Sequence, residues 1–396
     1  DTLFRLVLLI MFGLPRTVVV LGFVSFLNDA ASEMITPLLP LFLTATLGAG
    51  PAIVGLIEGV AEATASLLKL VSGRLADRGW NHKRLVLGGY SVSNLARPLI
   101  GIALGWTWVL ALRFLDRVGK GIRTSPRDAL IAASTGEGTR GRSFGFHRAL
   151  DNAGGMVGPL LAFALLSANV PLQHVFLWSL VPGLLVLALL IWGLDGTPSP
   201  LAHVDKSPLR WSLLDRQVRG LVIAAGGLAM ASAPEAFLVL WASDRGLAIA
   251  WVPLIWAASS AVKAFVAGPA GALSDRCGRV PVLLTGWGLR ILLLVALAFT
   301  ANGQGEPVTW ILFLAYGAAL AMTEGTERAL IGDFSQPTQR GTAFGLYHMT
   351  IGLAALPGAL LFGALWQGFG APIAFISSAA IATLSSVVLL RSARPA

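Results

Sequence analysis

The chain has 396 residues, of which 55% are hydrophobic and only 12% are charged, and its formal net charge is +9. In soluble domains roughly a quarter of the residues are charged. This composition and a mean hydropathy of +0.75 therefore exclude an ordinary soluble multidomain protein. The single cysteine, Cys277, excludes a disulfide framework and a cysteine-rich zinc module.

Apolar segments follow one another along the whole chain. Residues 1–13 are apolar but short and lack a signal-peptide cleavage site, so we expect an amphipathic lead-in on the membrane surface. The later runs of about 20 residues are each long enough to cross roughly 30 Å of hydrocarbon as a helix. They predict an all-α integral membrane protein with twelve transmembrane helices, at 16–44, 51–75, 84–105, 107–131, 141–167, 172–193, 217–242, 250–273, 280–300, 307–332, 340–366 and 371–391.

Two motifs occur twice in the chain. Gly73–Arg78 returns as Gly271–Arg276 after 198 residues, and Arg127–Ile131 aligns with Glu327–Ile331 after 200 residues. Repeated membrane segments are typical of secondary transporters, whose halves enclose the substrate site. We therefore expect two pseudo-symmetric six-helix bundles joined by a linker: 1–193 (with the lead-in), 194–216 and 217–396.

Basic residues gather in alternate predicted loops, from Arg74 and Arg78 to Arg391 and Arg394. By the positive-inside rule, these loops, both termini and the linker face the cytoplasm, as in a prokaryotic inner-membrane protein. The positive net charge therefore reflects topology, and no nucleic-acid partner is expected. The expected partners are the lipid bilayer and a small-molecule or ion substrate.

The C-terminal copy of the motif, Gly271–Arg279, fits a Gly-x-Leu-[Ala/Ser]-Asp-Arg-x-Gly-Arg pattern, whereas the N-terminal copy departs from it after Arg78. The chain thereby resembles the major facilitator superfamily (MFS), and most closely its proton-coupled efflux members. The resemblance implies the MFS fold, alternating access, a monomer, and a proton gradient instead of a cofactor as the energy source. It leaves the substrate open, because one scaffold serves many substrates.

Enzyme activity is not expected, since the chain has no Gly-x-x-x-x-Gly-Lys-[Ser/Thr] loop and no His-Glu-x-x-His element. The repeated motif instead predicts a cytoplasmic gate. Its carboxylates lie at helix ends beside arginines, where ion pairs can form in one conformer and part in another. The expected gating residues are Asp77, Arg78, Asp275 and Arg276.

Charged residues inside the predicted spans are the candidate substrate and proton site, because charges at membrane depth are costly and normally face a cavity or a partner. Asp29 and Glu33 lie one helical turn apart, as do Glu58 and Glu62, and as do His147 and Asp151. The candidate residues are Asp29, Glu33, Glu58, Glu62, Arg97, Arg113, Asp116, Arg117, His147, Arg148 and Asp151.

Three interpretations of this set stay open. The carboxylates can carry protons that drive export of a small molecule or cation, which is the favoured function. Asp29, Glu33, His147 and Asp151 can form a transient transition-metal site. The arginines can bind an organic anion. A lipid or amphiphile flippase is a further alternative on the same fold.

A purely structural role is the competing explanation for these charges. Internal ion pairs between Asp116 and Arg113, Glu62 and Arg97, or Asp151 and Arg148 would then only fix helix packing. Prolines add a mechanical expectation, since Pro37 and Pro40 should break the first span just beyond Glu33.

Overall fold

The computed structural model describes residues 14–77, 80–134, 140–194, 211, 216–300, 306–334 and 340–392, and the regular structure within them is helical. Contacts group the chain into two compact units, one of Asp1–Leu38 with Leu67–Asp205 and the other of Leu39–Ser66 with Lys206–Ala396. Each unit has an apolar core of its own, around Leu21 and Tyr90 in the first and Trp287 and Leu221 in the second.

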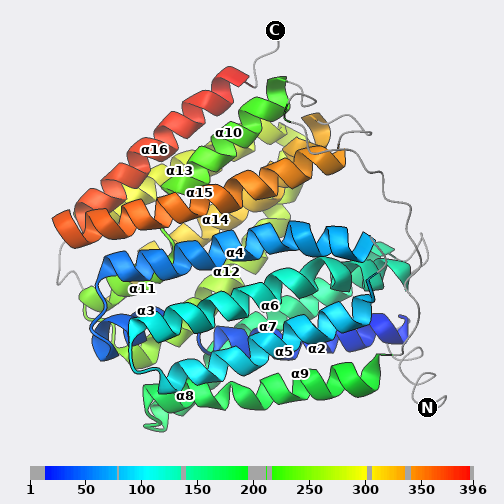
Figure 1. Ribbon diagram of the computed structural model, residues 1–396. Helices are drawn as coiled ribbons and strands as arrows, with labels where there is room; N and C mark the ends of the chain where they lie inside the picture. Colours follow the sequence, from blue (N-terminus) through cyan, green and yellow to red (C-terminus); the bar gives the residue numbers. More distant parts are fainter. Residues whose placement is uncertain are drawn as a thin grey trace. The chain divides into compact units, whose positions relative to one another are not determined.

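The first unit is built from six helices and the end of a seventh (Figure 1). They are α2 (Arg16–Glu33), α5 (His82–Leu99), α6 (Trp106–Ala133), α7 (Arg140–Ser167), α8 (Leu172–Trp178), α9 (Leu180–Gly193) and the last turns of α4 (Pro51–Asp77). Helix α2 ends at Glu33, as the prolines predict, because the ring of Pro37 clashes with the carbonyl four residues earlier. The expected span 16–44 is therefore interrupted.

Glycines let α5 and α6 approach each other very closely. A Cβ at Gly89 would lie 2.6 Å from the Gly119 carbonyl oxygen and 2.7 Å from the Cβ of Arg123. The Ser93 hydroxyl donates a hydrogen bond to the Asp116 carbonyl oxygen (2.9 Å) across this crossing. Small residues at a helix contact permit such backbone proximity. The crossing places the polar residues of α5 directly against those of α6.

Gly89→Ala is expected to destabilise the folded protein by about 1–3 kcal/mol, the usual cost of overpacking. Gly88→Ala is the matched control, because a Cβ at Gly88 meets no atom within 4 Å. An alanine there should be neutral or slightly stabilising, since it restricts the unfolded chain. Thermal unfolding of the purified variants measures both effects, and equal melting temperatures would contradict the tight crossing.

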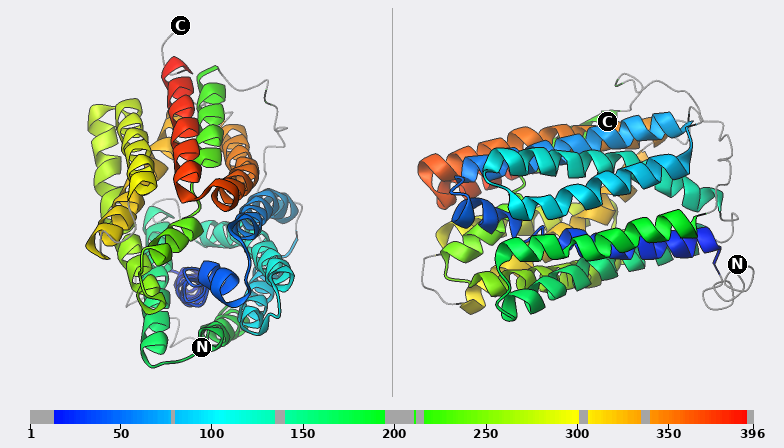
Figure 2. Two further views of the ribbon diagram at one scale, coloured as in Figure 1. Left: turned by 90° about the vertical axis from the view of Figure 1, so that its left-hand side faces the viewer. Right: turned by 60° about the horizontal axis from the view of Figure 1, so that its bottom comes forward.

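The second unit contains the remaining helices. They are α3 (Leu39–Leu41), the start of α4, α10 (Arg216–Ala231), α11 (Glu235–Asp244), α12 (Val252–Cys277), α13 (Arg279–Phe299), α14 (Glu306–Phe334), α15 (Arg340–Phe369) and α16 (Ala371–Ser392). Figure 2 shows α10 (green) and α16 (red) side by side. The span expected at 217–242 is divided at Ser232–Pro234 into α10 and α11.

The start of α4 packs on α15 within the second unit. A Cβ at Gly55 would collide with the Ala359 carbonyl oxygen, and one at Gly59 would lie 3.1 Å from the backbone of Leu356. This contact explains why Leu39–Ser66 groups with the C-terminal helices, although a division at 194–216 would place it in the N-terminal bundle. The bundle boundaries inferred from the sequence stay a prediction.

In the C-terminal copy of the repeated motif, the structure explains why a glycine and an arginine occupy the last two positions. Gly278 links α12 to α13 with φ of 93°, a left-handed conformation that residues with a side chain rarely adopt. The side chain of Arg279 then donates to the Ser274 hydroxyl (2.8 Å) and pairs with Asp333 of α14 (3.0 Å). The glycine and the arginine of the motif thus shape the turn and tie it to α14.

Nine helical segments in the described ranges are long and apolar enough to cross a membrane. They include 146–167, 172–193 and 279–299. Helices α2, α5 and α6, expected to be spans as well, are not among them, and α5 and α6 carry several charged side chains. The all-helical membrane fold is confirmed, while the number twelve stays a prediction.

Candidate functional site

A buried carboxylate surrounded by arginines lies between α5 and α6 in the first unit. Asp116 has a side-chain exposure of 1% and pairs with Arg97 at 2.7 Å, Arg117 at 3.3 Å and Arg113 at 3.6 Å. The guanidinium group of Arg97 comes from α5, whereas Arg113 and Arg117 flank Asp116 on α6. Asp116 is therefore an anion shared by three guanidinium groups.

Neutral polar groups extend the cluster to α2. Arg97 donates hydrogen bonds to the side-chain oxygens of Asn28 (3.0 Å) and Asn94 (3.3 Å). Two turns beyond Asp116 on α6, Arg123 lies 4.3 Å from the ring centroid of Tyr90 and donates to the Ser93 hydroxyl at 2.7 Å. The charged residues at 113, 116, 117 and 123 of α6 are all buried. Helix α6 therefore turns a charged face inward.

A second cluster joins α2 to α7 through two carboxyl groups. Asp29 of α2 and Asp151 of α7 lie next to each other, close enough for their charges to interact. Asp151 also accepts from the Ser25 hydroxyl (2.8 Å) and pairs with Arg148 (3.0 Å), and the Asn28 amide donates to Asp29 (2.9 Å). Two carboxyl oxygens can form a hydrogen bond only if one of them carries a proton.

Basic groups surround the carboxyl pair. Arg127 of α6 donates to the Ser25 hydroxyl at 3.4 Å and pairs with Asp128 at 2.9 Å. His147 lies one turn before Asp151 on α7, is 5% exposed, and its Nε2 atom has no hydrogen-bond partner within the described structure. Sequence reasoning missed Ser25 and Arg127, because neither stands out before α2, α6 and α7 are brought together.

The other predicted site residues lie elsewhere. Arg97 pairs with Asp116 and not, as one structural explanation supposed, with Glu62. Glu58 and Glu62 belong to the part of α4 that groups with the second unit, and Glu62 is exposed. Glu33 is the half-buried last residue of α2. The pairs of Asp116 with Arg113 and of Asp151 with Arg148 are present.

The gating residues are only partly described. Arg78 and the side chains of Asp77 and Asp275 lie outside the described residues, and Arg276 is exposed. The ion pair that the structure does place at this turn joins Arg279 to Asp333. The gating role of the motif stays a prediction.

The interior of the second unit holds fewer charges. Glu235 of α11 pairs with Lys263 of α12. Glu327 of α14 is buried and accepts hydrogen bonds from the indole of Trp287 (3.0 Å) and the hydroxyl of Tyr347 (2.7 Å). Arg290 of α13 is buried and donates to the Ser232 hydroxyl.

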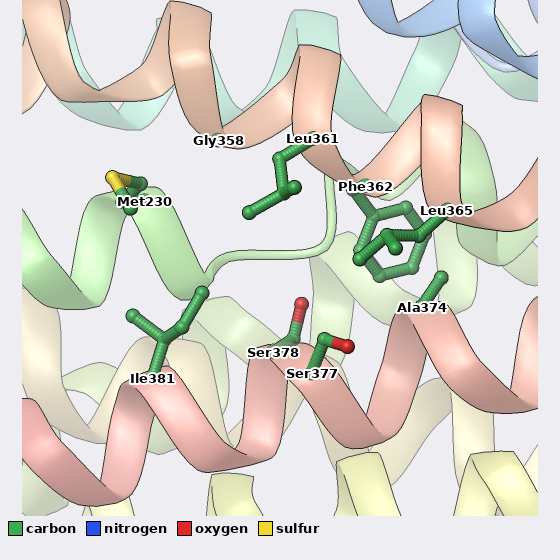
Figure 3. A pocket seen from close by; sticks show the side chains of 9 residues that line it. All are labelled: Met230, Gly358, Leu361, Phe362, Leu365, Ala374, Ser377, Ser378 and Ile381. Atoms are coloured by element: carbon green, nitrogen blue, oxygen red, sulfur yellow. The ribbon is translucent and has the colours of Figure 1, made fainter.

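No metal site occurs in the described part of the chain. The described His, Cys, Asp and Glu residues include no group of three or more that could hold a metal ion, so Asp29, Glu33, His147 and Asp151 do not form one. Figure 3 shows a shallow hollow between α10, α15 and α16, whose lining includes Met230, Leu361 and Ser378 but no charged residue. The charge clusters are therefore the better candidates for function.

Comparison with known proteins identifies the class. The chain matches the model of the Major Facilitator Superfamily over residues 21–326 and 252–396. It is 31% identical over 384 residues to an MFS-type transporter of Methanocaldococcus jannaschii, covering 95% of each chain. It is 24% identical over 363 residues to the multidrug resistance protein MdtH of Aeromonas hydrophila, covering 89% of this chain and 86% of that protein.

The fold agrees with these relatives. The nucleoside transporter NupG superposes with a TM-score of 0.78 at 12% identity, over 96% of this chain and 100% of that chain. Apolar helices that enclose buried charge clusters thus define an integral membrane transporter, not an enzyme. The chain belongs to the major facilitator superfamily, as the repeated loop motif predicts.

Proposed function

We propose that the chain exports a small molecule across the inner membrane in exchange for protons, as a monomer with both termini in the cytoplasm. Membership of the superfamily supports alternating access between its two halves. The name of the Aeromonas hydrophila relative, a multidrug resistance protein, supports the direction of transport. The distribution of Lys and Arg supports the orientation.

The carboxyl pair of Asp29 and Asp151 carries the proposal of proton coupling. With the proton in place, one hydrogen bond joins α2 to α7. Without it, two carboxylates are in contact, and like charges so close repel strongly away from water. Loss of the proton therefore favours another arrangement of these two helices. That is the requirement for coupling protonation to a conformational change.

The neighbours of the pair have defined roles in this mechanism. Ser25 and Asn28 donate to the carboxyl groups and hold them in position. Arg148 pairs with Asp151 and balances the charge of that carboxylate, so the proton of the pair would reside on Asp29. We propose His147, which is buried next to the pair, as the group that passes the proton on. Glu33, Glu58 and Glu62 remain secondary candidates for proton carriage.

Asp29→Asn tests the proposal, because asparagine has nearly the same size and hydrogen-bonding capacity but cannot release a proton. We expect efflux driven by a proton gradient to fall to background in sealed vesicles loaded with cationic dyes, organic anions or metal ions. Exchange of the same substrate without a gradient should persist, since the substrate site is intact.

Asp244→Asn is the matched control, because this exposed aspartate at the end of α11 belongs to neither charge cluster. Its transport should equal that of the wild type. Wild-type gradient-driven transport in the Asp29→Asn variant would refute the carboxyl pair as the proton carrier. If the wild-type protein transports its substrate at the same rate with and without a proton gradient, proton coupling is refuted.

A further inference from the structure

One buried arginine in the second unit has no direct counter-charge. Arg290 lies on α13 and is 3% exposed. Its guanidinium donates to the Ser232 hydroxyl, just after the end of α10, and lies 5.7 Å from the ring centroid of Tyr316 on α14. Both contacts are neutral. The buried acid Glu327 of α14 lies near enough to interact with this charge, but no ion pair joins the two side chains in the described residues.

The hydrogen bonds around Arg290 are incomplete. Its Nε atom has no acceptor within the described structure, and neither does the hydroxyl of Tyr316, which is 0% exposed. The two unmatched donors belong to neighbouring side chains, because the guanidinium carbon lies 5.7 Å from the centre of the tyrosine ring. Buried donors without acceptors are rare in folded proteins and call for an explanation.

The nearby acid does not provide the missing partner. The ion pairs described in this unit join Lys263 to Glu235 and Arg279 to Asp333, and none includes Arg290. Both carboxylate oxygens of Glu327 accept hydrogen bonds from other groups, the Trp287 indole and the Tyr347 hydroxyl. The Nε atom of Arg290 and the Tyr316 hydroxyl therefore stay without an acceptor among the described residues.

The buried arginines of the first unit differ from Arg290 in having a carboxylate as an ion-pair partner. There, the buried guanidinium groups of Arg97, Arg113 and Arg117 each pair with the same carboxylate, Asp116. Arginine is suited to planar oxyanions, because its fork of donors matches two oxygens at once and its charge strengthens the hydrogen bonds. The site at Arg290 offers this charge and adds a tyrosine hydroxyl as a further donor.

We propose that Arg290 and Tyr316 bind an oxyanion group, a carboxylate or a phosphate, of the transported molecule. This assignment builds on the proposed export of a small molecule and names its chemical class. The group would accept hydrogen bonds from the Nε atom of Arg290 and from the Tyr316 hydroxyl. A free organic anion and an anionic lipid headgroup share this chemistry.

Ligand-dependent thermal stabilisation of the purified full-length protein, without a proton gradient, is the direct test. The free-anion probes are benzoate and phenyl phosphate, with benzylamine as the matched cation. The lipid probes are dioctanoyl phosphatidic acid and, as its neutral control, dioctanoyl phosphatidylcholine. We expect at least one oxyanion probe to stabilise the wild type. Stabilisation by benzoate or phenyl phosphate would indicate a free organic anion, and stabilisation by dioctanoyl phosphatidic acid would indicate a lipid headgroup. Arg290→Gln should weaken that binding at least about tenfold, the loss of a charge-assisted hydrogen bond.

Further variants separate binding from folding. Tyr316→Phe removes only one hydroxyl and should weaken binding while the protein still folds, and Arg290→Lys should retain part of the affinity because the charge remains. Arg391→Gln, at an exposed arginine near the end of α16, is the matched control and should bind as the wild type does. If no oxyanion probe binds, or if both Arg290→Gln and Tyr316→Phe bind normally, the proposal is wrong. Arg290 would then be a structural partner of Ser232.

The two proposals fail separately. Binding of an oxyanion to the Asp29→Asn variant with wild-type affinity would support the Arg290 site even if proton coupling proved wrong. Conversely, gradient-driven export of a cationic dye alone, with no binding of the anionic probes, would support proton coupling and overturn the Arg290 site.

Discussion

Replacing Asp116 with asparagine is expected to destabilise the protein by about 3–5 kcal/mol, the typical cost of breaking a buried ion pair from one side. Three arginine side chains converge on this carboxylate, and it is 1% exposed. Asparagine has nearly the same shape but no charge, so three guanidinium groups would be left in the interior without their anion. Yield of folded protein and the denaturant midpoint in detergent measure the effect.

A compensating change tests the cause. Arg97→Gln in the Asp116→Asn background removes one of the unneutralised cations and should recover part of the lost stability. Asp333→Asn is the control, because this carboxylate is 55% exposed and its pair with Arg279 resembles a surface ion pair, worth at most about 1 kcal/mol. Equal losses in Asp116→Asn and Asp333→Asn would show that burial of the cluster does not determine its energetics.

Gly154→Leu is the substitution with the second large expected effect. A Cβ at Gly154 would collide with the Phe26 carbonyl oxygen of α2, and one at Gly158 would lie 2.5 Å from the Ala30 carbonyl oxygen. Backbone cannot move aside as a flexible side chain can, so leucine must push α2 and α7 apart, at a cost of at least about 2–3 kcal/mol. The same displacement would separate Asp29 from Asp151, so we expect loss of gradient-driven transport as well.

The adjacent glycine supplies the control for this substitution. A Cβ at Gly155 meets no atom within 4 Å, although Gly155 is the next residue of the same helix. Gly155→Leu should therefore keep both the unfolding temperature and transport close to those of the wild type. Comparable losses in the two variants would mean that leucine disturbs α7 itself and not its contact with α2.

Together, the proposals divide the chemistry between the units. The carboxyl pair that would carry the proton lies in the first unit, on α2 and α7. The arginine that would bind the substrate oxyanion lies in the second, on α13. The higher density of charge in the N-terminal half was visible in the sequence, but the chemical use of the sparse C-terminal charges was not.

Much of the fold depends on local features of the chain, and these could be predicted from the sequence alone. Apolar runs of membrane length, an internal repeat and alternating basic loops are sufficient to predict a helical membrane transporter of this superfamily. The break after Glu33 follows from Pro37, and the inward face of α6 follows from charges repeated at helical spacing. Each of these features depends only on residues within a few turns of one another.

Only the tertiary structure decided which charges are partners. Periodicity shows that Asp116, Arg97 and Glu62 each lie on a helix, but it does not show which helices are in contact. The close contact of α5 and α6 at Gly89 and Gly119 brings Arg97 within ion-pair distance of Asp116. The crossing at Gly154 likewise joins Asp29 to Asp151, and the break after α10 places Ser232 beside Arg290. The physical reason is that an ion pair or hydrogen bond requires atoms within about 3–4 Å, a distance set by how the helices pack and not by the order of residues along them.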